Sequence, residues 1–139
     1  MKERCLISAW SKVELEINDV ESLKQALIEL GYHPEIHEEI QSLFARSGKK
    51  MPSKYDSNII VRYKECSSVA WGDLGFRKEN GKYTLVSDLF PREKKQFVGS
   101  VKQLYGKYRV IKQVKKLGFR LSSQKIDKKG CLKIRLMAP

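Results

Sequence analysis

Two aspartates that flank a predicted hairpin, Asp73 and Asp88, are the clearest candidates for acid–base or metal chemistry in this chain of 139 residues. The Asn80-Gly81 pair lies between two β-rich segments and predicts a two-residue type I′ turn, because both turn positions need positive φ. In the register set by this turn, Asp73 faces Asp88. Facing carboxylates repel, so such a pair shares a proton, holds a metal ion or is neutralised by a cation. A bulge at Gly75 would instead shift the register by one residue and leave both aspartates with structural roles.

Basic side chains recur at seven-residue intervals along the last predicted helix, at Lys95, Lys102, Arg109 and Lys116. At 100° per residue these four positions form one basic ridge, joined by Lys112, with roughly 10 Å between successive members. Such a ridge could follow a phosphate backbone, because backbone contacts need charge rather than base-reading geometry. Tyr105 lies beside the ridge, where its ring would stack on a base or on Arg109. The alternatives are a solvated helix face and a protein interface.

The end of the chain adds to this positive charge. From Arg92 onward there are fifteen Lys or Arg residues and two acids, a net charge of +13, whereas residues 1–91 carry −1. In the predicted terminal hairpin, Lys133 and Arg135 share a strand face that Arg120 is expected to join. Helix and hairpin would form one continuous positive surface if they pack side by side. The asymmetry favours an acidic partner, with RNA or a ribonucleoprotein first and an acidic protein surface second.

The sequence gives little support for a metal centre, a cofactor or a nucleophilic enzyme. His33 and His37 have zinc-like spacing, but Pro34 disfavours the helix that would bring both rings to one face. No Gly-x-Ser-x-Gly motif, phosphate loop or Rossmann glycine pattern occurs. The cysteines lie far apart and without paired spacing, at Cys5, Cys66 and Cys131. We therefore expect no metal, no cofactor and a reducing compartment.

Hydrophobic periodicity predicts the elements that must position these residues. Alternation over residues 13–17 predicts a strand, and helical spacing over 19–30 predicts a helix that starts at Asn18 or Asp19. Further elements are predicted as a strand over 58–64, a hairpin over 68–89, a helix over 93–117, and a second hairpin that pairs 119–126 with 131–137. The apolar stripe of the last helix is expected at Phe97, Val101, Leu104, Tyr108 and Ile111.

Residues 37–57 are harder to assign. The start of this segment, HEEIQSLF, is compatible with one or two helical turns, and the remainder contains Gly48, Pro52 and several serines. We expect a mobile insert here. The whole chain, residues 1–139, is then a single α+β domain in which two main helices cover a mostly antiparallel sheet, in the order strand-helix-strands-helix-hairpin.

Four segments together resemble a known family: ISAWSKVELEINDVESLKQALIELGY, DLGFRKENGKYTLVSDLF, QFVGSVKQLYGKYRVIKQVKKLGF and IDKKGCLKIRL. They are similar, in the same order, to the family of the hypothetical chloroplast reading frame thirty-five, a domain of unknown function in algal plastids and cyanobacteria. The most specific matches are Asp73-Leu-Gly75-Phe76, the strand from Tyr83 to Asp88 and the tail from Gly118. The chain departs from the family in having RCLISAW where a Ser-His-Phe segment is usual, and in being more basic. The resemblance implies a plastid or cyanobacterial location and no particular activity.

These patterns predict a small basic binding module, without enzymatic activity, that contacts RNA or a ribonucleoprotein through its last third. The alternative is an assembly or scaffold factor that docks an acidic protein surface, and a third hypothesis is an enzyme or metal site built on Asp73 and Asp88. No apolar run approaches the roughly 18–20 residues that a membrane span needs. The first ten residues lack the features of a signal or transit peptide. The expected location is the plastid stroma if the protein is plastid-encoded, and otherwise the cyanobacterial or bacterial cytoplasm.

Overall fold

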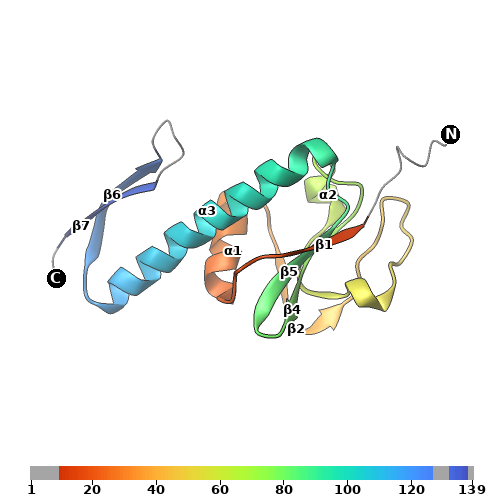
Figure 1. Ribbon diagram of the computed structural model, residues 1–139, viewed down its shortest axis with the longest axis horizontal. Coiled ribbons are helices and arrows are strands. Elements are labelled where there is room, and N and C mark those ends of the chain that lie inside the picture. Colours follow the sequence, from red (N-terminus) through yellow and green to blue (C-terminus); the bar gives the residue numbers. More distant parts are fainter. Residues whose placement is uncertain (1–9, 127–131, 138–139) are drawn as a thin grey trace.

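The structure, a computed structural model, describes residues 10–126 and 132–137, which form a five-stranded sheet, two long helices and a separate two-stranded hairpin (Figure 1). The elements follow the chain as β1 (Ser11–Glu14), α1 (Val20–Glu29), β2 (Glu35–Gln41), β3 (Ser57–Val61), α2 (Tyr63–Cys66), β4 (Leu74–Glu79), β5 (Lys82–Ser87), α3 (Pro91–Lys116), β6 (Arg120–Ile126) and β7 (Leu132–Met137). A short 3-10 helix, η2 (Ser53–Tyr55), precedes β3.

The five-stranded sheet has the order β1-β5-β4-β3-β2, and every neighbouring pair of strands is antiparallel. The segment containing α1 joins the two edge strands, β1 and β2, and the chain then returns across the sheet through β3, β4 and β5. The prediction of an α+β fold with two main helices and a mostly antiparallel sheet is therefore confirmed. None of the helices in the described ranges is long and apolar enough to cross a bilayer.

The central hairpin has the predicted turn and register. Asn80 and Gly81 have φ angles of 53° and 81°, which a type I′ turn requires. The two-residue turn pairs Phe76 with Leu85, and both side chains are completely buried. A slip of one residue would turn both side chains to the other face of the sheet, so burial and turn geometry select the same register.

One face of the sheet packs against α1 and α3. Leu23 and Leu27 of α1 and Val101 of α3 join Phe76 and Leu85 in one continuous core. Each of these side chains is at most 1% exposed, and burial of a side chain of this size stabilises the fold by roughly 1.5–3 kcal/mol. The core therefore fixes both helices on the sheet and decides which side of α3 faces solvent.

The opposite face of the sheet is covered by residues 42–56 instead of a helix. Leu43 packs against Ile60 of β3 and Val86 of β5, and all three side chains are completely buried. Partly buried residues complete this second cluster, namely Trp10, Met51 and Tyr55. Both faces of the sheet are therefore apolar and covered. Residues 42–56 contribute to the hydrophobic core through Leu43.

The segment 37–57, predicted to be a mobile insert, is joined to the sheet at both ends. Its first residues belong to β2, so the helical turn predicted for HEEIQSLF is wrong. The edge of β3 supplies backbone partners for β2, as in the pairing of Gln41 with Ser57 and of the preceding Ile36 with Ile59. Helix preference is a weak local effect, and pairing with a sheet edge overrides it here. The mobility of this segment stays a prediction, but its place is on the sheet.

The helix α3 is 26 residues long, which corresponds to about 39 Å. It begins at Pro91, where the missing N–H costs no hydrogen bond, and the chain leaves it through Gly118 with a φ of 88°. Its first part lies against the sheet and α1, and its last turns run past them toward the β6–β7 hairpin (Figure 1). The exposed side of α3 is therefore continuous along most of the molecule.

The predicted terminal hairpin is present as a separate sheet of β6 and β7, beside the C-terminal end of α3 and away from the five-stranded sheet (Figure 1). A shift in the ladder between Leu121 and Ser123 places Arg120 opposite Met137. The side chains of Lys133 and Arg135 on β7 are exposed. The side chain of Arg120 lies outside the described part of the chain.

We predict that Gly75→Ala destabilises the protein, because a Cβ at this position would lie 2.8 Å from Leu43 Cδ1 and would also overlap the Ser57 side chain. Overpacking of this kind typically costs about 1–3 kcal/mol. The matched control is Gly99→Ala on the exposed side of α3, where nothing lies within 4 Å of the added Cβ. It should stabilise the helix by about 0.5–1 kcal/mol. Urea unfolding measures both, and an unchanged midpoint for Gly75→Ala would show that residues 42–57 do not pack on the sheet.

Candidate functional site

The Asp73 carboxylate is engaged in structural contacts. Its Oδ2 accepts hydrogen bonds from the Phe44 N–H at 2.8 Å and from Arg62 Nη1 at 2.9 Å, and its Oδ1 accepts from the Tyr63 N–H at 2.8 Å. Arg62 also bonds both carboxylate oxygens of Glu35, at 2.9 and 3.0 Å. The Asp73 side chain is only 4% exposed. It joins the segment covering the sheet to the end of β3, with Arg62 supplying the compensating charge.

The regular β4–β5 pairing does not reach Asp73 and Asp88. The β4–β5 ladder ends two positions before the aspartates, and the next bridge joins Ala70 to Leu89 with the register shifted by two residues. Of the three outcomes that the sequence left open for a carboxylate pair, neutralisation by a cation is the one observed at Asp73. Within the described ranges, no group of three or more His, Cys, Asp or Glu side chains is placed to hold a metal ion.

Tyr105 belongs to the core and not to the basic ridge, which corrects its predicted role in stacking. Its hydroxyl oxygen accepts the N–H groups of Asn18 and Asp19 at 3.2 and 3.1 Å, and its O–H donates to Asn18 Oδ1 at 3.2 Å. Tyr108, predicted to be in the core, is half-buried and donates its O–H to Glu29 Oε1 at 2.5 Å. The helix is thus rotated toward α1 relative to the stripe expected from the sequence.

Asp19 caps α1 and ties it to α3. Its Oδ2 accepts the Ser22 N–H at 3.1 Å and the Ser22 O–H at 2.5 Å, and its Oδ1 accepts from Lys112 Nζ at 2.9 Å. Burial alone would raise the pKa of Asp19, but the hydrogen bonds from Ser22 and Lys112 outweigh it and lower the pKa to about 2. Arg109 Nη1 lies 3.9 Å from the same carboxylate. Lys112 is therefore used within the fold, and Arg109 is partly neutralised.

A second ion pair joins the same two helices. Lys107 is 91% buried by the rest of the chain, and its Nζ lies 2.7 Å from Glu29 Oε1. Burial opposes ionisation of Glu29, but hydrogen bonds from Lys107 and Tyr108 outweigh it and lower the pKa of this carboxyl. The sequence did not single out Lys107, because only its position opposite α1 distinguishes it from the other lysines of the helix.

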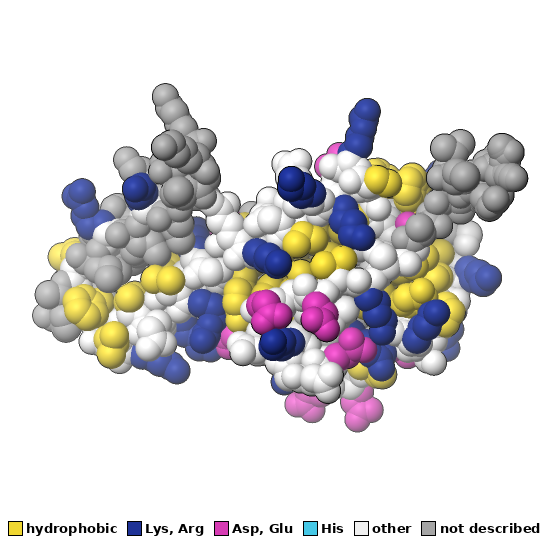
Figure 2. Space-filling model, in the orientation of Figure 1, with side chains coloured by type: hydrophobic (Ala, Val, Ile, Leu, Met, Phe, Trp, Pro, Cys, Tyr) yellow, Lys and Arg dark blue, Asp and Glu magenta, His cyan; other side chains and the backbone are white. Residues whose placement is uncertain are grey.

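The remaining members of the basic ridge are exposed. Lys95, Lys102 and Lys116 have no ion pair within 4.0 Å among the described residues, and Glu93 is the one acidic residue of α3. Figure 2 shows Lys and Arg side chains over the first half of this helix. The structure thus keeps a positive surface on α3, but it rests on fewer residues than the sequence suggested.

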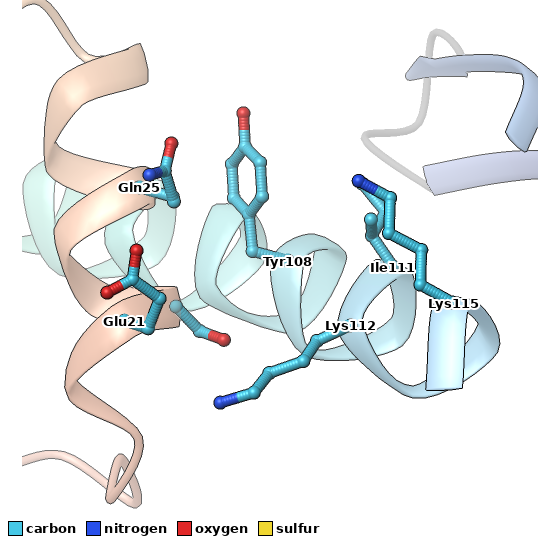
Figure 3. A pocket seen from close by; sticks show the side chains of 7 residues that line it. Glu21, Gln25, Tyr108, Ile111, Lys112 and Lys115 are labelled. Atoms are coloured by element: carbon cyan, nitrogen blue, oxygen red, sulfur yellow. The ribbon is translucent and has the colours of Figure 1, made fainter. Parts of the chain in front are cut away.

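A hollow of about 520 Å³ opens between α1 and the C-terminal half of α3, beside the basic ridge. Its wall is formed by Glu21, Ser22, Gln25, Tyr108, Ile111, Lys112 and Lys115 (Figure 3). Side chains of both charges lie at its edge, and Lys112 already pairs with Asp19. The hollow is therefore a continuation of the α1–α3 contact with no clear preference for one charge.

The sequence did not predict a second hollow at the other face of the sheet, formed by Trp10 together with residues 49–52, Lys54 and Tyr55. One sequence signal was available: RSGKKMPSKY, residues 46–55, has four basic residues, no acid and an aromatic residue at its end. Nothing in the sequence brings Trp10 to this segment, because about forty residues separate them along the chain.

These features define a small basic α+β protein whose two helices are fixed on one face of an antiparallel sheet and leave a positive helix surface exposed. The chain belongs to the DUF1257 family, described as a protein of unknown function, whose family model matches residues 26–136. It is 28% identical over 132 residues to "Uncharacterized protein ycf35" from Pyropia yezoensis, covering 92% of this chain and 94% of that protein. The family resemblance in the sequence is thereby confirmed. No solved structure matches this chain.

We predict that Tyr105→Phe destabilises the protein by about 1–3 kcal/mol, because two backbone N–H groups at the start of α1 lose their acceptor. The control is Tyr83→Phe, a buried tyrosine whose hydroxyl has no hydrogen-bond partner among the described residues. It should change the free energy of unfolding by less than about 0.5 kcal/mol. Equal effects in urea unfolding would show that the Tyr105 hydroxyl does not hold α1.

Asp19→Asn tests the contact between α1 and α3 through pH. The folded pKa of about 2 lies below the ordinary value of 3.8, so the stabilisation from ionised Asp19 is present above about pH 5 and is lost as the pH falls toward 2. The shift corresponds to about 2 kcal/mol. Asn still caps the helix but cannot ionise. Between pH 5 and pH 2, the free energy of unfolding measured with urea should therefore fall by about 2 kcal/mol less in the variant than in the wild type.

Glu21→Gln is the matched control for this measurement. Glu21 lies in the same helical turn and has no ion pair within 4.0 Å in the described chain. Its replacement should leave the wild-type dependence on pH unchanged. If Asp19→Asn also follows the wild-type curve, the Asp19–Lys112 contact does not stabilise the fold.

Proposed function

We propose that the protein binds RNA or a ribonucleoprotein through the exposed basic face of α3. The observation that supports this most strongly is the set of exposed ridge lysines that make no ion pair within 4.0 Å among the described residues, namely Lys95, Lys102 and Lys116. They recur at intervals of seven or fourteen residues, which places them roughly 10 or 20 Å apart along the helix. Their ammonium groups suit the phosphates of a strand that lies along the helix.

The position of Tyr105 decides what kind of binding this face offers. With that ring buried, the described part of the ridge presents ammonium and guanidinium groups and no aromatic ring. Contacts of this kind neutralise phosphates but do not read bases. We therefore propose binding that depends on charge and on the backbone, with Lys133 and Arg135 of the terminal hairpin extending the surface.

A second candidate function is an assembly or scaffold factor that docks an acidic protein. It is favoured by Val110 and Leu117 near the C-terminal end of α3, which are 43% and 62% exposed. Apolar side chains beside a charged rim are characteristic of protein interfaces. A nucleic-acid surface does not require them, so this second hypothesis makes a distinct prediction about where substitutions act.

The proposed site of action is the plastid stroma if the protein is plastid-encoded, and otherwise the cyanobacterial or bacterial cytoplasm. The similarity to the ycf35 protein of Pyropia yezoensis supports this placement. RNA and ribonucleoproteins are abundant in these compartments, so the proposed partner is available in each of them.

We predict that reversing the three exposed ridge lysines together, Lys95→Glu, Lys102→Glu and Lys116→Glu, abolishes RNA binding at moderate salt and preserves the fold. These residues make no ion pair among the described residues, so the α1–α3 contact should survive. Binding of a labelled single-stranded RNA should weaken steeply with salt in the wild type. Loss of three phosphate contacts should reduce the log–log salt slope by about 2.

The control for this variant carries the same change in charge at other sites: Lys24→Glu, Lys64→Glu and Lys78→Glu. These lysines lie on α1, α2 and β4 and have no ion pair within 4.0 Å in the described chain. The control should bind more weakly only to the extent that net charge matters. Equal losses in both variants, or no binding by the wild type at about 50 mM salt, would rule out a specific role for α3.

For the second candidate function, Leu117→Ser is the informative change. It should disrupt binding to a protein partner, because a 62%-exposed leucine at an interface loses apolar contact on substitution. It should leave binding to single-stranded RNA unchanged. An unaffected protein complex in a size-exclusion or pull-down assay would argue against the scaffold hypothesis.

A further inference from the structure

The sheet face opposite α1 and α3 carries a hollow of about 560 Å³. The side chains around it are of two kinds, aromatic or apolar residues and lysines, namely Trp10, Met51, Tyr55, Lys49, Lys50 and Lys54. At the right of Figure 2, where Figure 1 places the segment between β2 and β3, hydrophobic side chains are surrounded by Lys and Arg side chains. The volume lies within the roughly 300–1,000 Å³ typical of sites for small ligands.

The two aromatic rings pack against each other and against the rest of the fold. The centroids of Trp10 and Tyr55 are 5.8 Å apart, with planes inclined by 37°. Trp10 packs so closely on Gly72 that a Cβ there would lie 2.7 Å from Trp10 Cζ2. Tyr55 ends the short helix η2, where its N–H donates to the Pro52 carbonyl at 3.0 Å. Both residues are half-buried: they pack against the second core cluster and also line the hollow.

The charged side chains among the described residues that line the hollow are all positive. Lys49, Lys50 and Lys54 are exposed and have no ion pair within 4.0 Å in the described ranges, and none of the described residues that line the hollow is acidic. Lys54 Nζ lies 5.1 Å from the centroid of the Tyr55 ring. Three ammonium groups next to an aromatic surface suit a ligand that combines an anion with a flat ring.

We propose that this hollow binds one nucleotide unit, with its base against Trp10 and Tyr55 and its phosphate among Lys49, Lys50 and Lys54. An acidic peptide would use the lysines but would leave the rings without a partner. An apolar peptide would use the rings but would leave the three exposed lysines without a partner. A nucleotide satisfies both kinds of side chain. The site is independent of the basic ridge on α3, and the nucleotide is either free or part of an RNA strand.

The test uses the full chain labelled with 5-fluorotryptophan and fluorine NMR. The protein has two tryptophans, and Trp71, which packs on Phe90 with ring centroids 4.3 Å apart, is the internal reference. The probes are adenosine monophosphate, hexaadenylate, ribose 5-phosphate and polyglutamate at low salt. Adenosine monophosphate or hexaadenylate should shift the Trp10 signal and leave the Trp71 signal in place.

The matched probes separate stacking from charge. Ribose 5-phosphate lacks the base and should bind at least about tenfold more weakly than adenosine monophosphate. Tighter binding of hexaadenylate per nucleotide identifies an RNA strand as the ligand, whereas equal or weaker binding identifies a free nucleotide. No shift with either nucleotide probe at millimolar concentration, equal binding of ribose 5-phosphate, or the same shift with polyglutamate would overturn the proposal.

Substitutions assign the effect to this hollow. Lys49→Glu with Lys50→Glu should weaken binding of adenosine monophosphate at least about tenfold, because two of its phosphate partners become repulsive. Lys64→Glu with Lys78→Glu changes the net charge equally and should leave binding within about twofold of the wild type. The variant with all three ridge lysines reversed should also retain binding of adenosine monophosphate, which separates this site from the proposed function of α3. Equal losses in the two charge-matched pairs would show that only net charge matters.

Discussion

The contact between the start of α1 and the middle of α3 determines how the molecule presents its charge. Tyr105 accepts two backbone N–H groups that α1 leaves without helical partners, and Asp19 caps the helix while pairing with Lys112. Both interactions act across a sequence separation of more than 80 residues. They set the rotation of α3 about its axis, and this rotation decides which lysines are used inside the fold and which remain available to a partner.

The sheet separates two positive surfaces of different chemistry. On the α3 side the exposed groups are ridge lysines, which neutralise phosphate without reading it. On the other side, Trp10 and Tyr55 lie beside three lysines, and stacking becomes available together with charge. The segment that carries the second surface is also the cover of the sheet, through Leu43. Leu43 joins this loop, which contains Gly48 and several Ser and Lys residues, to the core, and the loop brings Tyr55 next to Trp10.

Local patterns predicted the elements, and contacts between distant residues decided the site. The helix after Asp19 and the Asn80-Gly81 turn depend on neighbouring residues and were predicted from the sequence. The alternation at 13–17 predicted a strand in this region, which the structure has at Ser11–Glu14. The strand over HEEIQ was missed because the edge of β3, rather than its own composition, makes it a strand. Tyr105 lies 80° from Phe97 on an ideal helix and is buried only because α1 packs on that side. The partner of Asp73 was equally hidden, since Arg62 has no sequence signature that links the two residues.

The most direct test of the central claim is purification of the full chain, at low salt, from the cells that make it, with and without ribonuclease. The account predicts that RNA copurifies with the wild type and with the variant carrying Lys24→Glu, Lys64→Glu and Lys78→Glu. It also predicts that RNA is lost after ribonuclease treatment and from the variant with the three exposed ridge lysines reversed. The contradicting result is that no RNA is recovered and that a protein partner copurifies in equal amount with and without ribonuclease. That result would show that α3 serves a protein interface.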